Sequence, residues 1–161
     1  MVSSMDKWYV LGFAFDRKRE KVVLIHKEKP EWQAGKLNGV GGKFEKEDSC
    51  IHDAMVREFF EETGVITRKD DWTHYATMSF DNDIMGGGAQ IYVFRMWNDE
   101  IKDCSTYEQE VVEIIPLNEV YSKPLMHNLH ILIPLALQKE FGFVHLNQQM
   151  KPQSPIKHYT G

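Results

Sequence analysis

The chain has 161 residues, of which 42% are hydrophobic and 12% aromatic, and its net charge is −5. This length indicates a single domain that can bury a substantial core. Proteins that bind duplex nucleic acid are usually basic, whereas the longest basic run here is Arg17-Lys18-Arg19, so we expect no duplex partner. A small phosphorylated ligand remains open, because metal ions can neutralise its charge at an acidic site.

The strands expected from apolar and aromatic runs are, in chain order, residues 8–15, 21–26, 72–80, 90–97 and 111–115. A charged turn separates the first two, which predicts a hairpin. Residues 30–35 are expected to form a loop that leads into the short, glycine-bounded segment 36–40. Gly86-Gly87-Gly88 is expected to join the third and fourth strands through a flexible loop.

The last helix is expected to begin at Ser122-Lys123-Pro124 and to continue through the apolar run 125–137, with a kink at Pro134. Residues 1–147 then form one domain, and the polar, proline-containing segment 148–161 is expected to be loose. Strands on both sides of one helix, with a second helix near the end, indicate an α/β domain.

The ends of the chain and the cysteines bear on its location. The first seven residues contain no apolar signal-like region, and no 18 apolar residues run together, so we expect a cytoplasmic protein with no membrane partner. Cys50 and Cys104 lack any metal-site spacing, and they are interpreted as reduced thiols, with a disulfide left open. Oligomeric state is open, and a homodimer is one of the alternatives.

The most informative stretch is a helix expected to start at Asp48 or Ser49 and to end near Thr63, with Gly64 as its C-terminal cap. Its polar residues fall on one arc, about 140° wide at 100° per residue: Arg57, Glu58, Glu61 and Glu62. Its large apolar residues fall on the opposite arc: Met55, Val56, Phe59 and Phe60. The helix therefore buries one face and presents three carboxylates on the other.

Carboxylates at this spacing repel one another by a few tenths of a kcal/mol per pair, and a cation reverses the sign. Hard oxygen ligands suit Mg²⁺ or Mn²⁺, which take the rest of their shell from waters and substrate phosphates. The alternative is a solvated acidic face. The preceding Gly41-Gly42 favours the metal site, because glycines let the backbone approach a ligand and the Gly42 carbonyl could serve as one.

These residues resemble the Nudix box, whose pattern is Gly, five residues, Glu, seven residues and Arg-Glu-apolar-x-Glu-Glu-x-Gly-apolar. The second half matches at every defined position, from Arg57 to Val65. The first half departs from the pattern, because Asp48 follows Gly42 where Glu is expected and eight residues separate it from Arg57. Glu47 and Ser49 are the other candidates for this acidic position.

The resemblance covers residues 8–140 and implies the Nudix α/β/α sandwich around a mixed sheet, with hydrolysis of a diphosphate bridge by water. Carried over to this chain, it implies that Gly42, Glu58, Glu61 and Glu62 hold Mg²⁺ or Mn²⁺ and that Arg57 orients a glutamate. Glu58 or Glu61 could take the proton of the attacking water. Glu108 and Glu110, on the loop before the last predicted strand, are the other candidates, although a loop glutamate is more often solvated.

The substrate is less constrained. The accessory motifs of the ADP-ribose, dinucleoside-polyphosphate and NADH types are missing, whereas the segment from Leu37 to Lys43 resembles that of MutT-type oxidised-purine triphosphatases. The resemblance implies that Asn38 reads the base and that Lys43 binds substrate. An amide can pair with a purine edge, although Asn38 could instead only form the turn before Gly39. Trp32, Phe80 or Tyr92 could stack on a base, or pack in the core.

The sequence thus predicts a Mg²⁺-dependent pyrophosphohydrolase for a nucleoside triphosphate, such as 8-oxo-dGTP. Two alternatives are a Nudix hydrolase of another nucleoside diphosphate derivative (ADP-ribose, a nucleotide sugar, a dinucleotide or an RNA 5′ end) and a non-catalytic sensor of nucleotides. His127 and His130 lie three residues apart without a metal-site partner, so we interpret them as surface or packing residues.

Overall fold

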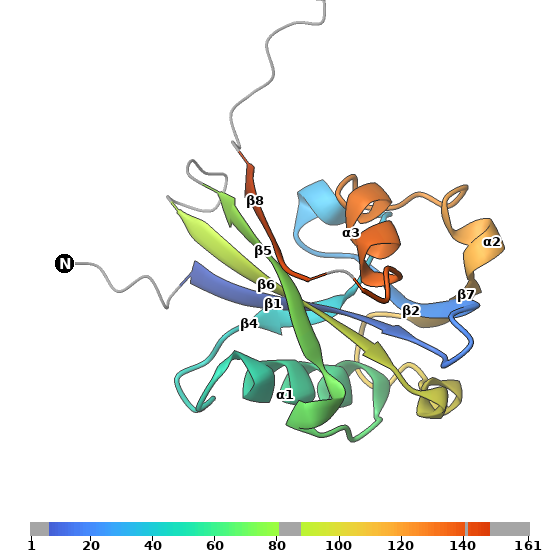
Figure 1. The fold of residues 1–161 in the computed structure, drawn as a ribbon, viewed down its shortest axis with the longest axis horizontal. Helices are drawn as coiled ribbons and strands as arrows, with labels where there is room; N and C mark the ends of the chain where they lie inside the picture. Colours follow the sequence, from blue (N-terminus) through green and yellow to red (C-terminus); the bar gives the residue numbers. More distant parts are fainter. Residues whose placement is uncertain (1–6, 81–87, 141, 149–161) are drawn as a thin grey trace, which may run out of the picture.

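The computed structural model describes residues 7–80, 88–140 and 142–148, which form a mixed sheet of eight strands between two helical layers (Figure 1). The strands are β1 (Trp8–Phe15), β2 (Lys21–His26), β3 (Leu37–Asn38), β4 (Val40–Lys43), β5 (Thr73–Phe80), β6 (Ala89–Trp97), β7 (Val112–Pro116) and β8 (Val144–Gln148). The helices are α1 (Ile51–Thr63) on one face and α2 (Leu117–Val120) and α3 (Leu129–Ala136) on the other. The α/β/α sandwich predicted from the sequence is confirmed.

The strand order β3-β2-β1-β6-β5-β8 places β1 at the centre of the sheet. Strand β1 pairs with β6 in parallel and forms the predicted hairpin with β2. Its other edge is shared: the end of β1 pairs with β2 (Phe15 with Val22), whereas its first half pairs with β4 (Val10 with Gly42). This change of partner brings the glycines of β4 beside the middle of the sheet.

Alternate residues of β1 enter different cores, as expected for a strand with both faces covered. Leu11, Phe13 and Phe15 pack toward α3, in a core that includes Leu132 and Ile133. Val10 and Ala14 pack toward α1, against a core that includes Met55 and Phe59. A Cβ atom at Gly12 would lie 2.6 Å from the Met55 methyl carbon, so the glycine lets α1 approach the sheet closely.

The start of α1 differs from the prediction. Cys50, not Asp48 or Ser49, occupies the N-cap position, and no side chain caps the helix. The Asp48 carboxylate instead accepts the backbone N–H of Glu45 and the guanidinium of Arg57. The predicted end is confirmed, since Gly64 adopts a left-handed conformation with φ of 77° and its N–H bonds the Phe60 carbonyl.

The last helix was predicted too long at its N-terminus. Residues 122–128 do not belong to α3, and residues 124–126 pair with β3 instead: Leu37 N–H donates to the Pro124 carbonyl and Met126 N–H to the Leu37 carbonyl. Pro134 lies inside the helix, as expected. Strand β8 was not predicted; it pairs in parallel with β5, so Gln148 ends a strand rather than beginning the tail.

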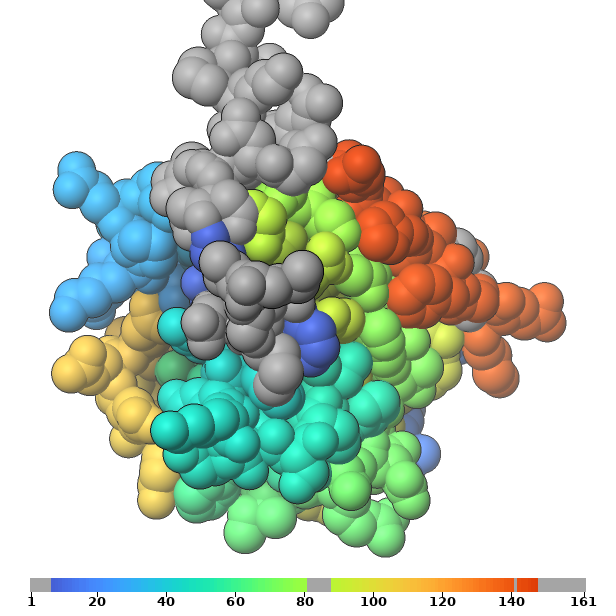
Figure 2. All heavy atoms as spheres, turned by 90° about the vertical axis from the view of Figure 1, so that its left-hand side faces the viewer, coloured from blue at the N-terminus to red at the C-terminus, as the bar shows by residue number. Residues whose placement is uncertain are grey.

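Two other expectations lie outside the described residues, those on Gly86-Gly87 and on the tail 149–161. The expected loop 30–35 contains one turn of 3-10 helix, Glu31–Gln33. Loop 27–36 (light blue) projects at the left edge of the view in Figure 2, on the side opposite β8. Within the described segments, both cysteines are free and no helix is long and apolar enough to cross a membrane.

Candidate active site

The carboxylate-bearing face of α1 is directed toward β4. Met55 and Phe59 are fully buried on the apolar side of the helix, and Phe59 packs edge to face against Trp72, whereas the small, buried Ala54 lies on the carboxylate side. This packing fixes the rotation of the helix, so that Glu58 is also largely buried, with 8% of its surface exposed. The amphipathic pattern therefore places the glutamates correctly, but Glu58 is more enclosed than a solvated acidic face would be.

The two glycines of β4, Gly41 and Gly42, lie so close to neighbouring atoms that no side chain fits at either position. A Cβ atom at Gly41 would lie 2.0 Å from the Val10 carbonyl oxygen, and one at Gly42 would lie 2.3 Å from Glu58 Oε2. Any side chain at these positions would displace β1 or the glutamate. The Glu58 carboxylate thus lies against the backbone of Gly42, which joins the glycine pair to the glutamate helix in one site.

Arg57 connects the acidic groups of the site. Its Nε and Nη2 donate to Asp48 Oδ1 and Oδ2 at 3.0 and 2.9 Å. Its Nη1 donates to Glu58 Oε2 at 3.0 Å and to Glu61 Oε1 at 3.2 Å, and Nη2 also reaches the Lys43 carbonyl at 3.0 Å. Such bidentate, charge-assisted bonds fix both partners. Of the three candidates for the first acidic position, Asp48 is the one that holds the arginine.

The electrostatics of this group follow from burial and from the arginine. Burial raises the pKa of Asp48 and is the largest single influence, but the hydrogen bonds from Arg57 and the Glu45 N–H together with the charge of Arg57 outweigh it, so the pKa lies below its ordinary value. The bond to Asp48 in turn raises the pKa of Arg57. For Glu58, burial dominates the opposing effect of Arg57, and its pKa rises to about 7. Glu58 therefore exchanges protons near neutral pH when no cation is bound.

Glu62 is the second carboxylate with a raised pKa, about 7, caused by burial first and then by the charges of Glu110 and Glu58, against which Lys27 acts. Its Oε2 atom is buried without a hydrogen-bond partner. An orphaned carboxylate oxygen of this kind is costly unless a cation or water reaches it. Together with Glu58, Glu61 and the Gly42 carbonyl, it supplies the hard oxygen donors that Mg²⁺ and Mn²⁺ prefer.

These oxygen donors do not by themselves form a complete coordination site for a metal ion. Within segments 7–80, 88–140 and 142–148, no group of three or more His, Cys, Asp or Glu side chains is arranged to hold an ion. This agrees with the chemistry of Mg²⁺, which usually completes its shell with waters and substrate phosphates. The orphaned oxygen of Glu62 and the close approach at Gly42 fit such a partial site.

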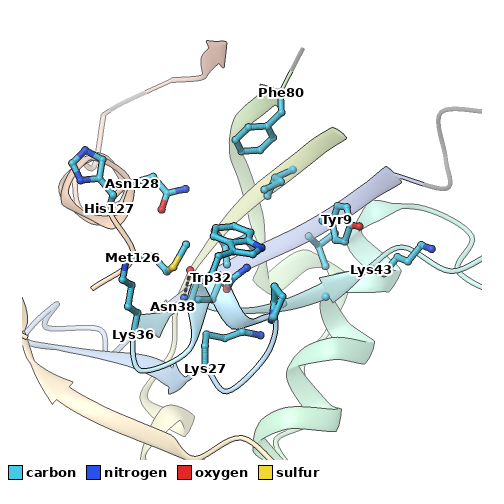
Figure 3. Close-up of a pocket in the computed structure, with 18 residues that line it drawn as sticks. Tyr9, Lys27, Trp32, Lys36, Asn38, Lys43, Phe80, Met126, His127 and Asn128 are labelled. Carbon is cyan, nitrogen blue, oxygen red and sulfur yellow. Dashed lines mark hydrogen bonds between the residues drawn. The ribbon is translucent and has the colours of Figure 1, made fainter. Parts of the chain in front are cut away.

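A pocket of about 470 Å³ opens beside the glycine pair (Figure 3). Its lining comes from six separate parts of the chain: residues 9–11, loop 27–36, residues 38–43, Phe80, Ile91 and residues 126–128. The size and the mixture of aromatic, apolar and amide groups suit a nucleoside-sized ligand. Gly41, Gly42 and Lys43 line it, so it adjoins the glutamate site at Gly42, against which Glu58 lies.

Asn38, which was predicted to bind the base, lines this pocket, but its side-chain amide already makes two hydrogen bonds within the protein. Its Oδ1 accepts the Gly39 N–H at 2.8 Å, which is the turn-forming role considered as the alternative, and its Nδ2 donates to Gln33 Oε1 at 3.2 Å (Figure 3). One Nδ2 hydrogen stays available to a ligand. Lys43 also lines the pocket, at the end remote from His127 and Asn128.

Among the proposed stacking residues, Trp32 and Phe80 line the pocket, whereas Tyr92 packs edge to face against Trp8 on the other side of the sheet. His127 lines the pocket, which the sequence gave no reason to expect, and His130 packs near Tyr121 at a ring distance of 6.1 Å.

Asn128 is the pocket residue that sequence reasoning missed. Its Nδ2 contacts Met78 Sδ at 3.5 Å, and its Oδ1 is buried without a hydrogen-bond partner. The only signal in the sequence was a lone asparagine at the beginning of an apolar run. Its place in the pocket depends on residues 124–126 pairing with β3, which the sequence did not predict.

A second hollow, of about 280 Å³, lies on the loop side of α1 and is lined by Lys27, Glu28, Lys29, Glu62, Glu108, Gln109 and Glu110. Glu108, proposed as a possible general base, therefore lines the same hollow as Glu62 and is exposed. Glu110 is more enclosed, and its Oε1 pairs with Lys27 Nζ at 3.1 Å.

The family model of the NUDIX domain matches residues 5–135. With the sandwich fold and the glutamate helix beside the glycine pair, this match defines a pyrophosphohydrolase, an enzyme that hydrolyses phosphoric anhydride bonds. The chain belongs to the Nudix family, as the resemblance of residues 42–65 implied.

Solved structures of similar fold include Mutator MutT protein from Bacillus halodurans, with a TM-score of 0.67, 18% identity and coverage of 89% of this chain and 90% of the other. The NUDIX domain of Shewanella oneidensis NrtR complexed with ADP ribose gives a TM-score of 0.68 and 19% identity, covering 79% and 83% of the two chains. No curated protein sequence matches at a significant level.

A third structure is a bifunctional NMN adenylyltransferase/ADP ribose pyrophosphatase from Francisella tularensis, complexed with AMP and a Mn ion. It gives a TM-score of 0.64 and 15% identity, and the match covers 83% of this chain and 42% of that longer one. Likenesses at these identities establish the common fold alone.

Proposed function

We propose that this Nudix hydrolase cleaves a purine nucleoside triphosphate, with an oxidised or non-standard one such as 8-oxo-dGTP among the candidates, to the monophosphate and pyrophosphate. The observation that carries the proposal is that an amide-containing pocket of about 470 Å³ adjoins the glutamate helix at Gly42, which lines the pocket and contacts Glu58. A nucleoside in the pocket has its phosphates directed past Gly41, Gly42 and Lys43 toward the carboxylates.

The pocket offers complementary hydrogen-bonding groups for a base. The buried Oδ1 of Asn128 needs a donor, such as a ring N–H or exocyclic amino group, and the remaining Nδ2 hydrogen of Asn38 needs an acceptor. A purine that has both can satisfy the two amides at once, whereas a ligand lacking the donor leaves the Asn128 oxygen unpaired. Trp32 and Phe80 supply aromatic surface for the ring.

In the reaction, Gly42, Glu58, Glu61 and Glu62 would hold Mg²⁺ or Mn²⁺. A divalent ion there supplies neutralisation of phosphate charge and activation of the attacking water. Arg57 keeps Glu58 and Glu61 in place, because it donates to both while Asp48 anchors it from the other side. Lys43 binds the phosphate chain at the pocket edge.

Two assignments of the general base stay open. Glu58 or Glu61 can accept the proton of the water from the helix side, and the raised pKa of Glu58 suits proton transfer near neutral pH. Glu108 can act from the loop side, since it lines the hollow that contains Glu62. Comparing the rates of the Glu61→Gln and Glu108→Gln variants distinguishes the two sides.

The second candidate substrate is ADP-ribose, favoured by the likeness to the NrtR domain, whose structure contains that ligand. A nucleotide sugar, a dinucleotide or an RNA 5′ end would undergo the same chemistry. A sensor that binds a nucleotide without hydrolysis is the non-enzymatic alternative. The intact set of Arg57, Glu58, Glu61 and Glu62 argues against a sensor, because mutually repelling carboxylates have no use without a cation.

The test is hydrolysis of a nucleotide panel with Mg²⁺, separating phosphate from pyrophosphate, for the native chain and Glu61→Gln. The panel contains dGTP, 8-oxo-dGTP, ADP-ribose, a dinucleoside tetraphosphate and NADH. We expect pyrophosphate release from a purine triphosphate and at least a hundredfold loss in the variant, as for removal of a key electrostatic group. Fastest turnover of ADP-ribose would overturn the substrate assignment, and binding without turnover of any nucleotide would favour the sensor.

A second arm tests the base pocket. Asn128→Leu removes the unpaired oxygen, so we expect about tenfold weaker discrimination in kcat/KM between dGTP and the triphosphate of unsubstituted purine deoxyriboside, whose base has no N–H donor. Asn128→Asp keeps an acceptor and is the matched control. A cytoplasmic location, the absence of a duplex nucleic-acid partner and a homodimer remain expectations beside this proposal.

A further inference from the structure

Lys27 lies between the nucleoside pocket and the hollow around Glu62. It follows the end of β2, and within the described segments it is the one residue that lines both the nucleoside pocket and the hollow around Glu62. Two other lysines line the pocket, Lys36 and Lys43, and both are exposed. The Lys27 side chain is only 17% exposed.

Glu110 holds this lysine in place. One carboxylate oxygen, Oε1, accepts Lys27 Nζ at 3.1 Å, and the other, Oε2, accepts the Glu28 N–H at 3.2 Å. The Glu110 side chain is also 17% exposed, so the pair is largely removed from solvent. The backbone on both sides is fixed as well, because Lys27 N–H bonds the Lys36 carbonyl and His26 N–H bonds the Val111 carbonyl.

A lysine held in this way is prepared for an anion. An ammonium group has three N–H donors, and Glu110 uses one of them. The other donors can reach a phosphate oxygen without breaking the pair. Because Lys27 is already restrained, binding would cost less side-chain entropy than recruiting the exposed Lys36.

We propose that Lys27 binds the phosphate chain of the nucleotide and that Glu110 is the positioning residue that holds Lys27 between the nucleoside pocket and the glutamate helix. The inference rests on the proposed function, since it needs a phosphorylated ligand in the pocket. It assigns Glu110 a role different from that of Glu108, which lines the same hollow but is exposed.

The competing interpretation is that the pair only fastens loop 27–36 to loop 104–111. That role is already served by the bonds from Glu28 to Glu110 and from His26 to Val111, neither of which needs the ammonium group. A purely structural pair would affect all ligands of the pocket equally. A phosphate-binding lysine would affect phosphorylated ligands alone.

The experiment therefore compares binding of deoxyguanosine and dGTP by calorimetry in EDTA, where metal-dependent hydrolysis is absent. We expect Lys27→Met to weaken dGTP binding about tenfold, in the range of one hydrogen bond to a charged group, and to leave deoxyguanosine binding unchanged. Lys102→Met, which changes an exposed lysine that lines neither hollow, is the matched control and should alter dGTP binding less than about threefold, as one screened surface charge would.

Glu110 is tested by a double-mutant cycle with the same two ligands. Glu110→Gln keeps an acceptor for the Glu28 N–H but loses the charge that holds Lys27, so its effect on dGTP binding should depend on whether Lys27 or Met is present. Equal effects in the two backgrounds would overturn the positioning role. An unchanged dGTP affinity in Lys27→Met, or an equal loss for deoxyguanosine, would overturn the phosphate-binding role.

The two proposals can fail separately. If the native chain binds neither dGTP nor deoxyguanosine, the purine-nucleotide function fails, and this inference with it. If the native chain binds dGTP and Lys27→Met binds it equally well, only the role of Lys27 fails. Thermal unfolding of each variant identifies any that has lost its fold, and for Lys27 the conservative variant Lys27→Arg should then restore dGTP binding if a cation is what matters.

Discussion

The glutamate helix and the nucleoside pocket are adjacent, but they are built in opposite ways. The functional groups of α1 lie within one segment, residues 57–62, and Arg57 ties them to one another and to Asp48. The pocket is lined by six separate parts of the chain and presents three uncharged amides, Gln33, Asn38 and Asn128. The reaction is thus encoded locally, and ligand selection is a product of tertiary structure.

The two regions also differ in their electrostatics. Burial and mutual repulsion raise the pKa of Glu58 and Glu62, so the helix is under electrostatic stress that a cation relieves. In the pocket, the unsatisfied group is instead the uncharged Oδ1 atom of Asn128, which can accept a hydrogen bond from the ligand. Changes on the helix side should therefore alter catalysis and metal response, and changes in the pocket should alter substrate preference.

The largest expected effect comes from Gly42→Ala, at the boundary of the two regions. The added methyl would lie 2.3 Å from Glu58 Oε2 and displace that carboxylate. We expect kcat to fall about a hundredfold, the cost of a misplacement of about 1 Å in a catalytic group, with dGTP binding in EDTA nearly unchanged. Gly142→Ala, where a Cβ would meet no atom within 4 Å, is the control. An equal loss of nucleotide binding would contradict the separation of the two regions.

A smaller effect is expected from Asp48→Asn, which weakens the anchor of Arg57. Asparagine has a single acceptor oxygen, so of the two bonds at 3.0 and 2.9 Å one would be lost and the other would lose its negative charge; kcat should fall about tenfold, as for loss of one charge-assisted hydrogen bond. Glu47→Gln changes the neighbouring, exposed acidic residue and should have no effect. A larger loss of kcat in the Glu47 variant would mean that Glu47, not Asp48, serves as the first acidic residue of the box.

The smallest expected effect is on stability as a function of pH in EDTA. Glu58 and Glu62 have folded-state pKa values of about 7, raised from 4.5, so the folded state binds more protons than the unfolded state between these values. Their contribution to stability is complete below pH 4.5 and is lost as pH rises to about 7. The melting temperature of the native chain should therefore fall across this range relative to Glu58→Gln, by about 2 °C or more.

Adding Mn²⁺ provides the complementary measurement. An ion that binds the deprotonated carboxylates stabilises the folded state more at pH 8 than at pH 5. The Glu58→Gln and Glu62→Gln variants should lose most of this stabilisation, while Asn128→Leu should keep it. If a pocket variant lost the Mn²⁺-dependent stabilisation as strongly as the helix variants, the assignment of metal binding to the helix alone would be contradicted.

The glutamate helix was predictable because its determinants are local. The apolar positions Met55 and Phe59 set the buried face, Gly64 sets the end, and the spacing of the glutamates sets the polar face. The first half of the box was not predictable in the same way. Asp48 was expected at a helix cap, but its carboxylate binds Arg57, a choice made by the three-dimensional path of the loop.

What the sequence by itself determined is the class of chemistry: hairpin, glycine pair, carboxylate helix and family all follow from residues close together in the chain. Only the tertiary structure decided which groups select the ligand. Asn128 enters the pocket because residues 124–126 pair with Leu37, and Lys27 is held there by Glu110, 83 residues away in the chain. Such contacts leave no periodicity in the sequence, since each depends on where separate segments meet once the sheet has formed.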